Sequence, residues 1–132
     1  MEDKEKMMEY QMLEQQLNTL GQNLENIENN LEEIRSIIQS LEEFKEVKKG
    51  DDILVPLANG IFAEATINNV KKLKVNVGSK VVLEKSIDET KKIMEDQISD
   101  LEEFREESEK YYMDMYNKMQ EIAQQLNEQR SS

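Results

Sequence analysis

The chain contains neither cysteine nor histidine among its 132 residues. Without cysteine there is no disulfide, thiolate nucleophile or Cys-type zinc site, and without histidine there is no imidazole base or metal ligand. No apolar run approaches the roughly 18 residues of a membrane helix. The start, with Glu2, Asp3 and Glu5, lacks the basic and apolar regions of a signal peptide. We therefore expect a soluble, cytoplasmic protein that does not contact membranes.

Hydrophobic residues are also few for a chain of this length. They make up 37% of the sequence against 35% charged residues, and mean hydropathy is -0.79, so a large globular core is not expected. Acidic residues outnumber basic ones by 29 to 17, which gives a net charge of -12. Such a chain repels a phosphate backbone, and this argues against nucleic-acid binding.

Composition divides the chain into three parts. Residues 1–49 carry 12 acidic and 6 basic side chains, residues 86–132 carry 13 and 6, and residues 50–85 carry 4 and 5. The only proline and three of the four glycines lie in that near-neutral middle, where turns are therefore concentrated. We expect two acidic helical arms, 1–49 and 86–132, around an insert at 50–85.

The first arm carries an unbroken heptad seam, which predicts a helix with one partner helix. Its members alternate at spacings of 3 and 4: Tyr10, Leu13, Leu17, Leu20, Leu24, Ile27, Leu31, Ile34, Ile38 and Leu41.

The second arm opens with Ser86 followed three residues later by Glu89, the pattern of a capping box at a helix start. Its seam has two polar members in the middle: Met94, Ile98, Leu101, Arg105, Ser108, Tyr112, Met115, Met119, Ile122 and Leu126. Arms of equal length joined by a short insert predict an antiparallel coiled coil. Residues whose numbers sum to 132, such as Leu17 and Met115, would then face each other, and every a position would meet a d position. A slip of one heptad would also pair a with d, so the pattern alone does not fix the register.

The insert changes to a period of two, which predicts four short strands in two hairpins. Ile53–Leu57 and Ile61–Ile67 flank a turn at residues 58–60, and Leu73–Val77 and Val81–Leu83 flank a two-residue turn at Gly78 and Ser79. So few residues cannot close a core, and their strand edges would stay unpaired. We expect another chain to complete the sheet; the alternative is a sheet that packs on the chain's own helices. The candidate assembly residues are Ile53, Leu54, Val55, Leu57, Ile61, Phe62, Ala63, Ala65, Ile67, Leu73, Val75, Val77, Val81, Val82 and Leu83.

The heptad arms together with residues 54–63 (LVPLANGIFA) and 75–85 (VNVGSKVVLEK) resemble an archaeal prefoldin alpha-class subunit over nearly the whole chain. The resemblance implies an α+β, mainly α fold: a long antiparallel two-helix coiled coil with two inserted β-hairpins, whose strands complete an intersubunit β-barrel. It further implies a hexamer of two alpha and four beta-class subunits. Such an assembly captures unfolded proteins at the coiled-coil tips and delivers them to a group II chaperonin, without nucleotide or other cofactor.

Methionine is concentrated where those tips would be. Seven of the eight methionines lie in the first 12 residues or between 113 and 119. Met8, Met12 and Met113 fall at outward heptad positions, whereas Met115 and Met119 fall on the seam and are better explained as core. Methionine is unbranched and polarisable, so a surface rich in it adapts to many apolar segments. The candidate client-binding residues are Met7, Met8, Tyr10, Met12, Met113, Met115, Tyr116 and Met119.

Paired carboxylates such as Glu102–Glu103 and Glu106–Glu107 lie mainly outside the seam, and we interpret them as a solvated face rather than as a metal or acid-base site. No phosphate-binding G-x-x-x-x-G-K-[ST] loop is present, so nucleotide hydrolysis has no visible site. Together with the absence of cysteine and histidine, this means that an enzyme is not expected. Two alternatives remain open. One is an architectural coiled-coil spacer that binds no client, and the more distant one is an enzyme whose carboxylates hold a divalent ion.

Overall fold

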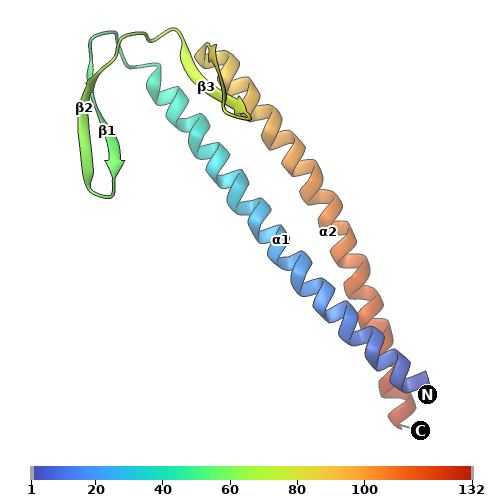
Figure 1. Ribbon diagram of the computed structural model, residues 1–132. Coiled ribbons are helices and arrows are strands. Elements are labelled where there is room, and N and C mark those ends of the chain that lie inside the picture. The colour runs from blue at the N-terminus through green and yellow to red at the C-terminus, as the bar shows by residue number, and fades with distance from the viewer. Residues whose placement is uncertain (1, 132) are drawn as a thin grey trace. The chain divides into compact units, whose positions relative to one another are not determined.

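The computed structural model describes residues 2–131, with side chains up to residue 128. Two long helices, α1 (Glu2–Phe44) and α2 (Ile87–Ser131), flank four strands (Figure 1). The chain forms two compact units, each described separately below. The terminal unit comprises the chain up to Glu32 and from Ser99 onward, and the insert unit is Glu33–Ile98. Neither helix of the described chain carries an apolar stretch long enough to cross a membrane.

The predicted seams become the buried stripes of both helices. Every one of the ten seam residues on α1, and every one on α2, is buried or half-buried. Leu31 has no exposed surface at all. Because apolar residues recur every three to four positions, they form one narrow stripe along each helix. This stripe is buried while the acidic faces stay solvated.

In the terminal unit the two helices pack in the predicted antiparallel direction. The core consists of Leu13 and Leu17 from α1 with Met115, Met119 and Ile122 from α2. Tyr10, Leu20, Tyr112 and Leu126 pack against this core. These partners agree with the predicted pairing, in which the two residue numbers sum to 132.

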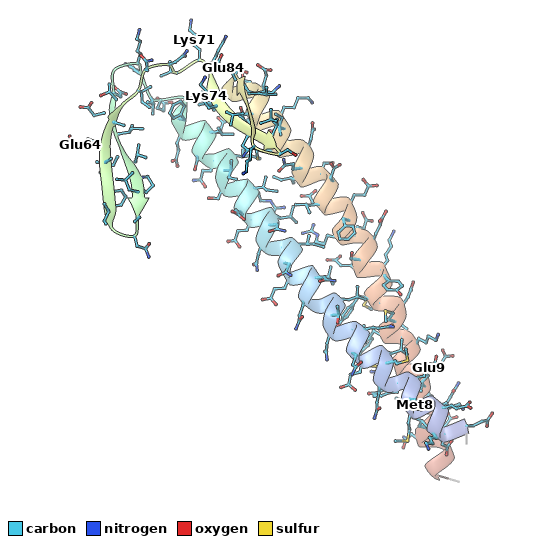
Figure 2. All side chains as sticks on the ribbon, viewed as in Figure 1. Met8, Glu9, Glu64, Lys71, Lys74 and Glu84 are labelled. Atoms are coloured by element: carbon cyan, nitrogen blue, oxygen red, sulfur yellow. The ribbon has the colours of Figure 1, made fainter. Side chains whose placement is uncertain are left out.

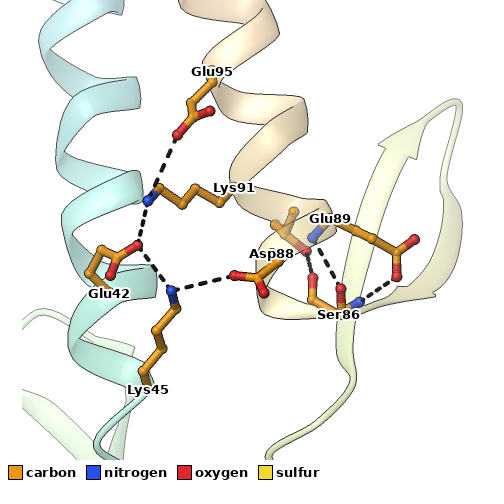
Figure 3. Close-up of polar contacts among 8 residues, drawn as sticks. Glu42, Lys45, Ser86, Asp88, Glu89, Lys91 and Glu95 are labelled. Atoms are coloured by element: carbon orange, nitrogen blue, oxygen red, sulfur yellow. Dashed lines mark hydrogen bonds and ion pairs between the residues drawn. The ribbon is translucent and has the colours of Figure 1, made fainter.

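The start of α2 is fixed by the predicted capping box (Figure 3). The Glu89 amide donates to Ser86 Oγ at 3.0 Å, and the Ser86 amide donates to Glu89 Oε1 at 3.2 Å. These reciprocal bonds satisfy amides that have no partner in the first helical turn. Because the Ser86 backbone amide binds the ionised carboxylate, the pKa of Glu89 lies below its ordinary value.

The insert unit contains two separate antiparallel hairpins. The first pairs β1 (Asp52–Ala58) with β2 (Ile61–Thr66), and the second pairs β3 (Leu73–Gly78) with β4 (Val81–Lys85). In the first hairpin Ile53 faces Ala65 and Val55 faces Ala63. Each hairpin has an irregular register next to its turn, between Pro56 and Ala58 and between Asn76 and Gly78.

Both turns differ slightly from their predicted positions. Ala58 belongs to β1, so the first turn is Asn59 and Gly60, with a positive φ of 75° at the glycine. The second turn was predicted at Gly78 and Ser79, but it lies one residue later, at Ser79 and Lys80, whose φ angles are 50° and 63°. Gly78 ends β3 with a φ of 122°, a conformation open to glycine, and this displaces the turn.

Candidate functional site

Exposed methionines distinguish the surface of the terminal unit. The exposed fractions are 44% for Met7, 59% for Met8, 61% for Met12 and 52% for Met113. Figure 2 shows Met8 near the start of α1. Four flexible thioether side chains in one unit provide apolar surface without a fixed shape.

Aromatic residues of the same unit are exposed as well. Tyr116 was predicted as part of the site and is 40% exposed. Sequence reasoning did not select Phe104 or Tyr111, yet these are 55% and 57% exposed. Each directly precedes a seam residue, Arg105 or Tyr112, so each lies beside the seam rather than in it. That flanking position makes both residues candidates for exposure, but it does not decide whether they are exposed.

Three predicted client-binding residues are less accessible. Met115 and Met119 are only 7% and 9% exposed and belong to the core of the terminal unit, as their seam positions indicated. Tyr10 is half-buried against that core. Met115 and Met119 therefore belong to the packed core between the helices and not to the exposed surface.

Two shallow grooves run beside the seam of the terminal unit. The first, of about 710 Å³, has the apolar residues Met7, Tyr10, Ala123 and Leu126 in its lining, with amide side chains such as Gln120 between them. The second is smaller, and its lining includes Met12, Thr19, Leu20 and Tyr111. Both combine apolar side chains with uncharged polar ones, a composition suited to extended apolar segments without a single required sequence.

The hairpins expose a second set of apolar side chains. Nine of the fifteen predicted assembly residues are at least a third exposed: Leu54, Val55, Leu57, Ile61, Phe62, Val77, Val81, Val82 and Leu83. The other six are half-buried: Ile53, Ala63, Ala65, Ile67, Leu73 and Val75. Leu54, Leu57, Ile61 and Phe62 are each more than half exposed, so these side chains of the first hairpin are not covered by the chain's own helices.

Each two-stranded sheet also leaves two strand edges with unpaired backbone groups. A charged pair joins the two strands of the second hairpin: Lys74 Nζ on β3 donates to Glu84 Oε1 on β4 at 2.6 Å (Figure 2). This bond lowers the pKa of Glu84. The hairpins therefore offer exposed apolar surface and free edges in the insert unit.

Charged residues near the helix ends of the insert unit form a connected set of ion pairs (Figure 3). Lys91 Nζ lies 2.7 Å from Glu42 Oε1 and 3.8 Å from Glu95 Oε1, and Lys45 Nζ lies 3.4 Å from Asp88 Oδ1. Hydrogen bonds from Lys91 and then Lys45 hold the pKa of Glu42 below its ordinary 4.5. The same carboxylate raises the pKa of both lysines above 10.5.

Arg105, the charged member of the seam, also forms an ion pair with a glutamate, in the terminal unit. Its Nη1 donates to Glu28 Oε1 at 2.6 Å, and this bond raises the pKa of the guanidinium. The polar seam position is thereby satisfied by a carboxylate from the opposite helix.

The acidic pairs of α2 lie mostly in solvent. Across residues 2–131, no group of three or more histidine, cysteine, aspartate or glutamate side chains is arranged to hold a metal ion. Glu103, Glu106 and Glu107 are exposed and Glu102 is half-buried, in keeping with a mostly solvated face.

Comparison with known proteins agrees with this architecture. A sequence profile described as "Prefoldin subunit" matches residues 13–131. The chain belongs to the prefoldin subunit family. The predicted resemblance is thus confirmed, and the chain is a chaperone-type subunit rather than a member of a known enzyme family.

Archaeal prefoldin subunits alpha are among its relatives. That of Archaeoglobus fulgidus is 29% identical over 125 residues, which cover 95% of this chain and 91% of the relative. That of Pyrococcus horikoshii is 29% identical over 121 residues, covering 91% and 82%. A cryo-EM structure of filamentous PFD from Methanocaldococcus jannaschii aligns with a TM-score of 0.79 at 23% identity, covering 87% of this chain and 95% of that one. This last likeness concerns the fold alone. It confirms the predicted fold class, in which two hairpins are inserted in the chain between two long helices.

Proposed function

We propose that this chain is the alpha-class subunit of a hexameric, ATP-independent chaperone of the cytoplasm, with two alpha and four beta-class subunits. Residues 50–85 form its assembly segment, and residues 1–49 and 86–132 form the arms. The terminal unit holds unfolded proteins, which are then transferred to a group II chaperonin.

The exposed methionines of the terminal unit carry the proposal. Met8, Met12 and Met113 lie outside the helix seam and are more than half exposed, so helix pairing does not account for them. An architectural spacer needs the seam and the hairpins but not this surface. An adaptable apolar surface fits a protein that holds many non-native sequences.

The hairpins support the assembly part of the proposal. Their apolar side chains and free edges invite strand pairing with other subunits, which would close a barrel and remove the edges. The absence of a phosphate-binding loop in the sequence supports action without nucleotide.

Co-expression with a candidate beta-class subunit tests the proposal directly. Native mass spectrometry at micromolar concentration should give six subunits in a ratio of two to four, and the complex should suppress aggregation of a denatured client without nucleotide. Adding a group II chaperonin should then release that client for folding. A hexamer that leaves aggregation unchanged would indicate a spacer instead.

A Phe62→Glu variant provides the assembly control. It places a charge on an apolar hairpin residue that is 56% exposed and leaves the terminal unit intact. We expect it to remain unassembled while its helices still form, as measured by circular dichroism.

A further inference from the structure

Negative charge is concentrated in the terminal unit. Residues 1–32 and 99–132 carry 17 acidic and 6 basic side chains, whereas residues 33–98 carry 12 and 11. Nearly all of the net charge of -12 therefore belongs to the unit that exposes the methionines and grooves.

Three basic residues of this unit are already engaged with carboxylates. Arg105 pairs with Glu28 at 2.6 Å, Lys118 with Glu9 at 3.4 Å and Lys110 with Glu106 at 3.8 Å. These pairs reduce the attraction that the cations could offer to an acidic ligand, while carboxylates remain in large excess.

Exposed carboxylates also flank the groove residues along the helices. Glu107 and Asp114 stand four residues before and three residues after Tyr111, so all three share one side of α2. Glu121 stands three residues before Gln124, which lines the first groove. Residues three or four positions apart on a helix are neighbours, so a ligand beside Gln124 or Tyr111 lies within a Debye length, about 10 Å at 0.1 M salt, of at least one of these carboxylates.

The exposed aromatic rings add an attraction for cations. Phe104, Tyr111 and Tyr116 are 55%, 57% and 40% exposed, and the faces of such rings attract lysine and arginine side chains. The lining amides and hydroxyls of the grooves are uncharged and do not oppose a cationic ligand.

We infer that the terminal unit selects unfolded segments in which apolar residues are flanked by lysine or arginine, and discriminates against equally apolar segments flanked by aspartate or glutamate. This inference rests on the proposed holding function and specifies its client class. The apolar residues occupy the grooves, and the flanking cations meet the surrounding carboxylates and aromatic rings. Because such charges mainly accelerate encounter and fix register, the selectivity depends on ionic strength.

Three fluorescent peptides test the inference. They share the same apolar core, which is flanked by lysine pairs in the first, serine pairs in the second and glutamate pairs in the third. Their dissociation constants for the assembled full-length chaperone are measured by anisotropy. At about 50 mM salt we expect the lysine peptide to bind on the order of tenfold more tightly than the glutamate peptide, and at about 500 mM we expect the difference to disappear.

A charge variant and a matched control locate the effect. Glu107→Gln, Asp114→Asn and Glu121→Gln together should remove most of the preference. Glu43→Gln, Glu46→Gln and Asp96→Asn make the same change in net charge at exposed positions of the insert unit and should retain it.

The outcomes separate the two proposals. Equal binding of all three peptides at low salt, or equal loss of preference in both variants, overturns the charge selectivity and leaves the holding function intact. If none of the peptides binds and client aggregation is not suppressed, both proposals are overturned.

Discussion

Replacing Met8, Met12 and Met113 together with glutamine tests whether the exposed methionines hold clients. Glutamine has nearly the same length and helix propensity as methionine but a polar end. None of the three positions belongs to the seam, so the helices and the assembly should be unaffected. We expect weaker capture of unfolded protein by the assembled variant.

The expected loss follows from the exposed area. The three side chains are 59%, 61% and 52% exposed. Fully burying a methionine side chain contributes about 1.5–3 kcal/mol, so covering the exposed half of each contributes about 1 kcal/mol. A client that covers half of the combined area would lose about 1.5 kcal/mol, which is roughly a tenfold rise in the dissociation constant.

The assay is titration of a labelled, permanently unfolded protein into parent and variant complexes, after native mass spectrometry has verified equal assembly. A Met8→Leu, Met12→Leu and Met113→Leu variant is the matched control, because leucine keeps the apolar area and the helix propensity. It should bind as the parent does. Unchanged affinity of the glutamine variant would refute the role of these methionines in holding clients.

Three further predictions concern stability. Leu31→Ala should lower the free energy of unfolding by about 3 kcal/mol, because this side chain has no exposed surface, while Ile37→Ala, at a position 39% exposed, should cost less than about 1 kcal/mol in the same urea titration. Gly21→Ala should raise the free energy of unfolding by about 1 kcal/mol, since the added Cβ would meet the Tyr112 ring at an ordinary 4.0 Å, and a lower urea midpoint would contradict this. The lowered pKa of Glu42 means that its contribution to stability is present above its unfolded value near 4.5 and is lost as pH falls through the lower folded-state pKa. In urea titrations from pH 7 to pH 3, Glu42→Gln should therefore lose less stability than the parent, and parallel curves would count against the assigned interaction.

Periodicity was sufficient to predict the helices and their packed faces. A spacing of 3 and 4 placed every seam residue from Tyr10 to Leu41 on a buried or half-buried stripe. The start of α2 followed from Ser86 and Glu89, because a capping box is a local interaction between residues close in sequence. Both features depend on spacing alone, and spacing is fully contained in the sequence.

Other features depend on neighbours that spacing does not identify. Arg105 is a charged member of the seam, and its charge is met by Glu28, which is 77 residues away in the chain. Phe104 and Tyr111 lie beside the seam, where a residue can be either covered or exposed depending on how closely the helices approach. The second turn depends on backbone angles at Ser79 and Lys80 that residue identity does not favour. These are properties of packing and local strain rather than of pattern.

The distribution of charge answers a difficulty raised by the exposed methionines. An apolar surface that binds unfolded chains also tends to bind its own copies. The unit that exposes these methionines carries 17 acidic and 6 basic residues, so two copies that approach through it repel each other. A cationic segment of an unfolded chain meets attraction at the same surface. If the proposed client selectivity holds, one set of carboxylates both opposes self-association and favours a class of client, and both effects should weaken together as salt concentration rises.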